Sequence, residues 1–92
     1  MNESICHKVH LCGRVQGVAF RHYTKQTADR LGITGWVRNC PDGSVEAVIC
    51  GGHEQLAQMQ AWLSEGPALA EVTSMQVSDT PAATFDNFDI RY

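Results

Sequence analysis

The segment Gly13-Arg14-Val15-Gln16-Gly17-Val18-Ala19-Phe20-Arg21 decides how this chain folds. A strand-like run, Lys8-Val9-His10-Leu11, leads into it, and an amphipathic helical pattern follows it. The first amides of a helix lack partners and carry the positive end of the helix dipole, so a glycine-containing loop at this place can hold an anion. Ser, Thr, Asp and Asn usually cap such amides, and none of them occurs in this segment. The segment therefore joins a strand to a helix whose start is uncapped.

Two interpretations of this loop are open from its chemistry alone. Gly13 and Gly17 can serve only to shape a tight turn, or the loop can cradle a phosphate with Arg21 as a charged clamp. A guanidinium can bind two phosphate oxygens at once, which a lysine cannot do. The spacing excludes a nucleotide-binding P-loop, because no Lys-Ser or Lys-Thr follows the second glycine. It also excludes a Rossmann loop, because the third glycine is absent.

The rest of the chain alternates strand and helix patterns. We expect strands at 5–12, 33–39, 44–50, 72–77 and 85–92, and helices at about 18–31 and 54–64. The buried stripe of the first helix is expected to contain Phe20, Tyr23, Thr24, Thr27, Ala28 and Leu31. The order is βαββαβ with a short extra C-terminal strand. It predicts an α+β fold, a ferredoxin-like two-layer sandwich with two helices on one face of a mainly antiparallel sheet.

Composition and charge narrow the class of protein. Ninety-two residues suit a single domain, 1–92, and the net charge of −3 argues against a general nucleic-acid surface. Six of the seven basic residues lie at or before Arg38, which suits a small anionic ligand. No apolar stretch approaches membrane-spanning length. Met1-Asn2-Glu3-Ser4 lack the features of a signal peptide, so we expect a cytoplasmic protein with no membrane partner.

Two motifs resemble those of a known family. Gly13 to Arg21 matches Gly-x-Val-Gln-Gly-Val-x-Phe-Arg of the acylphosphatases. Gly35-Trp36-Val37-Arg38-Asn39 is a second match, followed by Asp42-Gly43-Ser44-Val45-Glu46. The resemblance covers the whole chain. It implies the ferredoxin-like fold and a hydrolase acting on acid anhydrides, which cleaves the carboxyl–phosphate bond of acyl phosphates to a carboxylate and inorganic phosphate.

The resemblance also implies the roles of individual residues. It makes Arg21 and Asn39 catalytic, with Asn39 positioning the attacking water, although an asparagine in isolation is simply common where strands end. The phosphate-binding residues it implies are Val15, Gln16, Gly17, Val18, Ala19, Phe20 and Arg21. No metal or organic cofactor is implied. The expected partners are a small acyl phosphate and inorganic phosphate, with no nucleic acid, and the expected state is a monomer.

Several alternatives are weaker. A phosphatase using Cys12 is rejected, because Arg14 follows too soon and Arg21 too late for its anion loop. Cys6, His10 and Cys12 share a strand face but span too much of it to hold one metal ion. His22 is expected to be a surface histidine.

A non-catalytic anion-binding or regulatory module on the same fold is the main alternative function. The N-terminal domain of a larger carbamoyl-phosphate-handling factor is disfavoured by the short chain. An RNA-binding sheet is disfavoured because the central strands lack paired aromatic residues.

The four cysteines suit no secreted disulfide scaffold. In a ferredoxin-like sheet, however, the first and third strands are antiparallel neighbours, so Cys6 at the start of one lies beside Cys50 at the end of the other. Alternation places both side chains on the face without helices. We therefore predict that Cys6 and Cys50 can form a disulfide under oxidising conditions.

Overall fold

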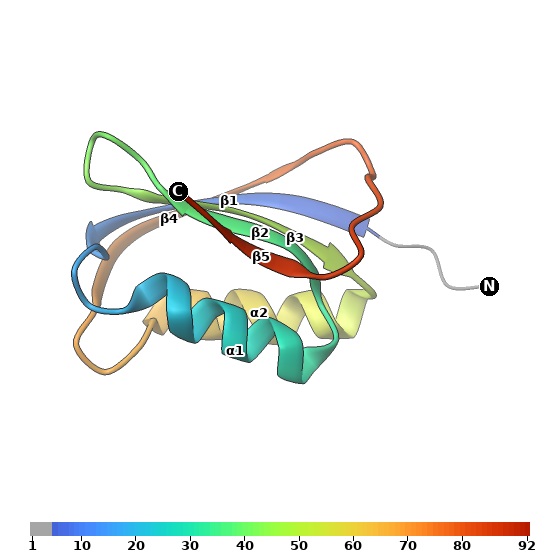
Figure 1. The fold of residues 1–92 in the computed structure, drawn as a ribbon, viewed down its shortest axis with the longest axis horizontal. Coiled ribbons are helices and arrows are strands. Elements are labelled where there is room, and N and C mark those ends of the chain that lie inside the picture. The colour runs from blue at the N-terminus through green and yellow to red at the C-terminus, as the bar shows by residue number, and fades with distance from the viewer. Residues whose placement is uncertain (1–4) are drawn as a thin grey trace.

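The computed structural model describes residues 5–92 and contains two helices and five strands (Figure 1). In chain order these are β1 (Ile5–Arg14), α1 (Phe20–Leu31), β2 (Thr34–Asn39), β3 (Val45–Gly51), α2 (His53–Glu65), β4 (Glu71–Asp79) and β5 (Phe88–Arg91). The signal-peptide argument rests on residues 1–4, which lie outside the described residues. Within residues 5–92, no helix is long and apolar enough to cross a membrane.

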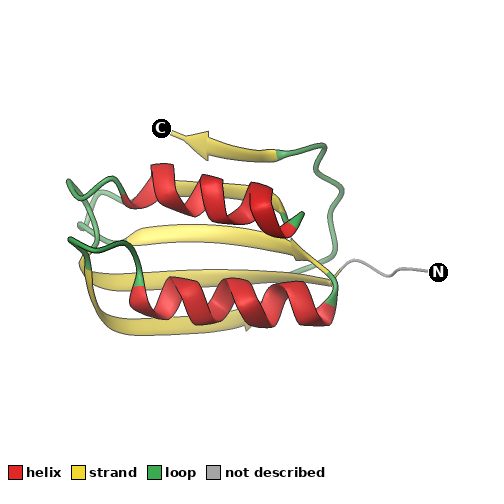
Figure 2. Cartoon of the chain, turned by 90° about the horizontal axis from the view of Figure 1, so that it is seen from below, coloured by secondary structure: helices red, strands yellow, loops and turns green. Residues whose placement is uncertain are grey.

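The strands form one sheet in the order β4-β1-β3-β2-β5. All neighbours are antiparallel except β2 and β5, which run parallel. Both helices cover the same face of this sheet, as the view from below shows (Figure 2). The predicted two-layer ferredoxin-like sandwich with an extra C-terminal strand is therefore confirmed.

The core lies between the sheet and the helices. Alternation along β1 turns Val9 and Leu11 inward, where both are fully buried. Other apolar side chains of this cluster with no exposed surface come from three strands and both helices: Ala28, Val37, Val45, Ala47, Ile49, Met59, Leu63 and Phe88. Each large aliphatic side chain buried in this way stabilises the fold by roughly 1.5–3 kcal/mol.

The start and the buried stripe of α1 differ from the sequence prediction. The helix begins at Phe20 rather than near Val18, because Ala19 takes a left-handed backbone conformation with φ 59°. Tyr23 is 44% exposed and is not part of the core. At about 100° per residue it lies roughly 60° around the helix from Phe20, so it reaches the edge of the buried stripe.

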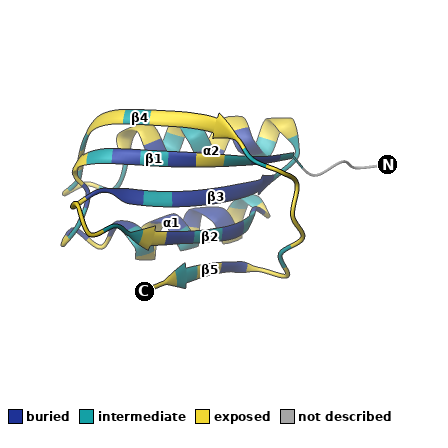
Figure 3. Cartoon of the chain, turned by 90° about the horizontal axis from the view of Figure 1, so that it is seen from above, coloured by how far each residue is buried: buried dark blue, intermediate teal, exposed yellow. Residues whose placement is uncertain are grey.

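The boundaries of β5 also differ from the prediction. The sequence predicts a strand at 85–92, but the observed strand covers only Phe88–Arg91. Phe85 instead packs over a small second cluster on the open face of the sheet, formed by Cys6, Val48 and Cys50 with Trp36 beside them. The strand therefore begins only after the chain has crossed back to the edge of β2 (Figure 3).

The predicted register of the two cysteines is confirmed. Cys6 and Cys50 are directly paired residues of β1 and β3, and their Cα atoms lie 4.1 Å apart. The structure joins them in a disulfide, whereas Cys12 and Cys40 are free. Formation of this bond in the oxidised protein stays a prediction.

Candidate active site

The loop between β1 and α1 has an unusual backbone. Gly17 has φ 74°, and Ala19 is the one non-glycine residue with positive φ among residues 5–92. A left-handed conformation costs a residue with a Cβ roughly 1–2 kcal/mol. Ala19 is also the N-cap of α1, where no side chain caps the helix and the first turn holds no acid. The first amides of α1 are therefore left without a capping side chain.

The side chains of this loop anchor it from below. Val15, Val18 and Phe20 are buried, whereas Gly17 and Ala19 between them are exposed. The apolar side chains thus fix the loop on the core while its backbone faces outward. Backbone amides exposed in this way can bind an anion, as they do at helix N-termini in general.

Gln16 ties the loop to the β2–β3 turn. Its side-chain amide donates hydrogen bonds to the carbonyl oxygens of Cys40 and Ser44, each at 2.8 Å. These contacts hold the loop against the chain that directly follows Asn39. Sequence reasoning placed Gln16 in the loop but missed this role of its side chain, because the partners lie 24 and 28 residues away.

The loop, α1, β2 and β5 surround a hollow of about 200 Å³. It is lined by Val15, Gln16, Gly17, Ala19, Phe20, Arg21, His22, Asn39, Ile90 and Tyr92. The structure therefore brings together both residues predicted to be catalytic and six of the seven predicted to bind phosphate. Val18 is the exception, since it faces the core and a groove on the helix side.

Arg21 is held by the last residues of the chain. Its Nη1 donates a long hydrogen bond of 3.5 Å to the carbonyl oxygen of Arg91, and its Cζ lies 4.8 Å from the centre of the Tyr92 ring. These contacts leave the half-buried guanidinium at the rim of the hollow. These contacts of Arg21 could not be predicted from nearby residues, because they depend on the parallel pairing of β5 with β2.

Asn39 is the last residue of β2, and the turn after it is braced by polar side chains. The amide and hydroxyl of Ser44 both donate to the Asp42 carboxylate, and His10 Nε2 lies 2.8 Å from Ser44 Oγ. The hydrogen bonds from Ser44 hold the pKa of Asp42 below its ordinary value, so Asp42 is ionised at neutral pH.

This grouping of Ser44, His10 and Asp42 is not a catalytic triad. In a triad the carboxylate orients the histidine, which in turn activates the serine. Here the carboxylate binds the serine directly, and none of these three side chains lines the hollow. We assign them a structural role in holding the turn.

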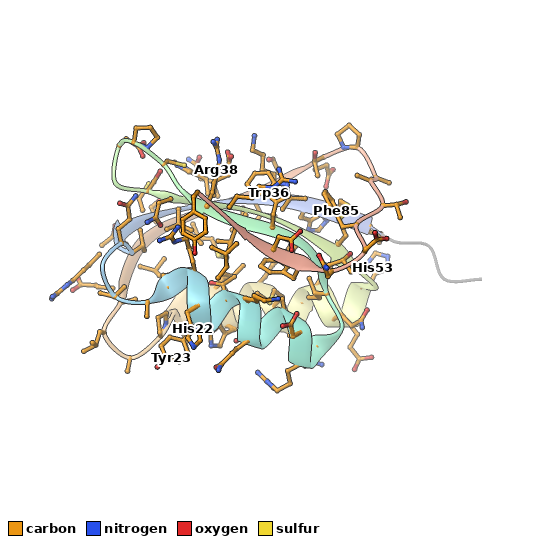
Figure 4. The ribbon with its side chains drawn as sticks, in the orientation of Figure 1. His22, Tyr23, Trp36, Arg38, His53 and Phe85 are labelled. Atoms are coloured by element: carbon orange, nitrogen blue, oxygen red, sulfur yellow. A yellow bond between two sulfur atoms is a disulfide. The ribbon has the colours of Figure 1, made fainter. Side chains whose placement is uncertain are left out.

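Charged side chains on the open face of the sheet pair with one another. Glu46 lies 3.2 Å from Lys8 and 2.8 Å from Arg38. Partial burial acts to raise the pKa of Glu46, but hydrogen bonds from the two cations outweigh it and lower the pKa. Arg38 and Trp36 lie on this face, away from the helices (Figure 4). Arg38 is a surface residue and does not line the hollow.

The structure also bears on His22 and on the question of a metal site. His22 is exposed as predicted, but it also borders the hollow and packs edge-on against Tyr23, with ring centres 5.1 Å apart. No group of three or more His, Cys, Asp or Glu residues within residues 5–92 is arranged to hold a metal ion.

This chain is similar to known proteins in both sequence and fold. The acylphosphatase family model matches residues 7–90. An acylphosphatase of Thiobacillus denitrificans is 54% identical over 68 residues, which cover 74% of this chain and 76% of that protein. One of Methanothrix thermoacetophila is 39% identical over 89 residues, covering 97% and 99%. The structure of an acylphosphatase from Coxiella burnetii superposes with a TM-score of 0.92 at 35% identity, covering 96% of this chain and 93% of that one. The chain therefore belongs to the acylphosphatase family.

Proposed function

We propose that this chain hydrolyses the carboxyl–phosphate bond of acyl phosphates, as a hydrolase acting on acid anhydrides. One observation carries the proposal. Arg21 from α1 and Asn39 from β2 border a single hollow of about 200 Å³, together with the uncapped start of α1. This combination supplies positive charge for a phosphoryl group and an amide for a water molecule.

The roles follow from the chemistry of phosphoryl transfer, which depends mainly on positioning and on charge stabilisation. The amides of residues 15–20 and the Arg21 guanidinium hold the phosphoryl oxygens. The Asn39 side chain both accepts from and donates to one water molecule, and so aims it at phosphorus.

The bond changes need no acid or base from the protein. A bond forms between the water oxygen and phosphorus while the bond from phosphorus to the acyl oxygen breaks, and its electron pair leaves with the carboxylate. That carboxylate is the base of an acid with a pKa of about 4, so it departs unprotonated. The proton of the water passes to a phosphate oxygen of the substrate.

A hydrolysis assay on benzoyl phosphate tests the proposal. We expect turnover after dialysis against a chelator, because backbone amides and Arg21 supply the charge, and we expect inorganic phosphate to compete with the substrate. A loss of activity that Mg²⁺ or Zn²⁺ restores would contradict the metal-independent mechanism. Phosphate binding without turnover would favour a non-catalytic anion-binding module. The proposal includes a cytoplasmic monomer that acts without a nucleic acid or membrane partner.

A further inference from the structure

A second and larger depression lies on the helix side of the same loop. This groove has a volume of about 830 Å³. It runs between α1 and the segment that joins α2 to β4, which includes Pro67 and Leu69. Gly17 and Ala19 line both the groove and the hollow described above. The two spaces are therefore adjacent, and the exposed backbone of the loop separates them.

The walls of the groove are mainly apolar and aromatic. Tyr23 is 44% exposed and Leu69 is 72% exposed, and these are two of the four exposed large apolar side chains described in residues 5–92. Tyr23 projects from the first turn of α1 away from the sheet (Figure 4). Trp62 of α2 adds a further ring. The hydroxyl of Thr27 donates to the carbonyl oxygen of Tyr23, so this polar group is satisfied inside the helix.

The geometry of attack at phosphorus relates the hollow to the groove. In an in-line displacement the attacking water and the leaving group lie on opposite sides of phosphorus. Asn39 belongs to the sheet, so a water that it positions attacks from the sheet side. The leaving carboxylate then departs on the side away from the sheet, and the groove lies on that helix side.

We propose that this groove binds the acyl group of the substrate and makes the enzyme prefer large apolar, aromatic acyl groups over small ones. The inference rests on the proposed function and specifies its substrate class. At 1.5 Å per residue, Tyr23 lies about 6 Å along α1 from Ala19, within reach of a single aromatic ring on a bound phosphate. Arg30 at the far end of the groove lies about 16 Å away and is out of reach of such a ring.

The test compares kcat/KM for benzoyl phosphate and acetyl phosphate in the full-length chain. We expect Tyr23→Ala and Leu69→Ala to lower kcat/KM for benzoyl phosphate about five- to tenfold, because each removes apolar surface from the acyl group. Acetyl phosphate should change less than twofold. Val77→Ala is the matched control, since Val77 is similarly exposed, at 40%, but lies on β4 outside the groove.

Each outcome decides the inference. A selective loss with benzoyl phosphate, at an unchanged inhibition constant for inorganic phosphate, supports it. Equal changes with both substrates, or no change in either groove variant, would overturn it while leaving the proposed function intact. A wild-type chain that hydrolyses neither substrate would overturn the proposed function and this inference together.

Discussion

Helices α1 and α2 lie side by side on one face of the sheet, and each follows a central strand, but their first turns differ (Figure 2). At the start of α2, the Gly52 amide donates to Gln55 Oε1 at 2.9 Å, and Glu54 places a negative charge in the first turn. At the start of α1, Ala19 offers no capping side chain and the first turn holds no acid.

Under the proposed function, the α2 terminus contributes to the stability of the fold and the α1 terminus binds phosphate. A capping residue stabilises a helix by about 1 kcal/mol, and an acid near the N-terminus adds a favourable interaction with the dipole. At the α2 terminus the Gln55 side chain binds one amide, that of Gly52, and Glu54 adds the negative charge. The α1 terminus has neither a capping side chain nor an acid in its first turn, so a bound anion can stabilise its free amides instead.

The largest expected effect on kcat/KM comes from replacing the Arg21 guanidinium at the start of α1. Arg21→Lys should lower kcat/KM about 10³-fold, because a point charge cannot replace two parallel hydrogen bonds to phosphate. The melting temperature should change little, since the guanidinium lies at the rim of the hollow. Steady-state kinetics and thermal unfolding are the measurements, and Arg14→Lys, at an exposed arginine outside the hollow, is the control. Retention of most activity would remove Arg21 from the mechanism.

Asn39→Ala tests the other side of the hollow. We expect kcat to fall about 10²-fold with little change in KM, because a group that places water acts mainly in the transition state. Asn87→Ala, at an exposed asparagine of the loop before β5, should behave like the wild type. Unchanged kcat with a raised KM would instead assign Asn39 to substrate binding.

A carboxylate added to each terminus probes the comparison directly. Ala19→Asp should raise KM and the inhibition constant for phosphate about tenfold, because the new carboxylate competes for the amides of α1. Asp tolerates the left-handed backbone at this position better than most residues. Gly52→Asp at the start of α2 should leave both constants unchanged and raise the unfolding temperature slightly. Equal kinetics in the two variants would contradict the distinction between the termini.

Gln16 and Gln55 form a matched pair, because each side chain makes two hydrogen bonds near the start of one helix. Gln16 donates to Cys40 and Ser44, whereas Gln55 accepts from Gly52 and donates to the carbonyl oxygen of Leu31. Replacing either by Ala should lower the free energy of unfolding by about 1–2 kcal/mol, as expected for two lost hydrogen bonds. Only Gln16→Ala should also lower kcat/KM, by about fivefold, because it loosens the loop beside Asn39. Denaturant unfolding and kinetics on both variants separate the two effects.

The smallest effect on turnover should come from the disulfide beside the start of α2. Closing a loop with a sequence separation of 44 stabilises the fold by about 4 kcal/mol at most in the chain-entropy model. Reduction should therefore lower the unfolding temperature but leave kcat/KM unchanged, since Cys6 and Cys50 lie outside the hollow. Mass spectrometry of the air-oxidised protein should find a Cys6–Cys50 linked peptide. Linkages through Cys12 or Cys40 alone would contradict the prediction.

Local patterns predicted the elements of this fold because its sheet and helices have strong periodicity. Val9 and Leu11 alternate inward along β1, and Gly32, directly after the predicted helix, ends α1 with φ 74°. The register of Cys6 with Cys50 followed from topology and alternation alone. These features depend on residues close in sequence or on a single strand pairing.

The supporting contacts of the site could not be predicted in the same way. Gln16 reaches the far side of the hairpin, and Tyr92 reaches Arg21 from the other end of the chain. Such contacts depend on where the folded chain places side chains that have many possible partners. Ala19 was also missed as a left-handed residue, because alanine normally favours a helix over this conformation.

The position of β5 has a consequence for how the protein fluctuates. This strand has four residues, lies at an edge of the sheet and pairs with β2. Its last carbonyl meets Arg21 across 70 residues of sequence. Short terminal edge strands open at a lower free-energy cost than core strands do. Brief detachment of β5 would therefore open the hollow while the rest of the sheet stays folded. The fraction of molecules with an intact hollow would then depend on the free energy of detaching β5 and not on the free energy of unfolding the whole chain.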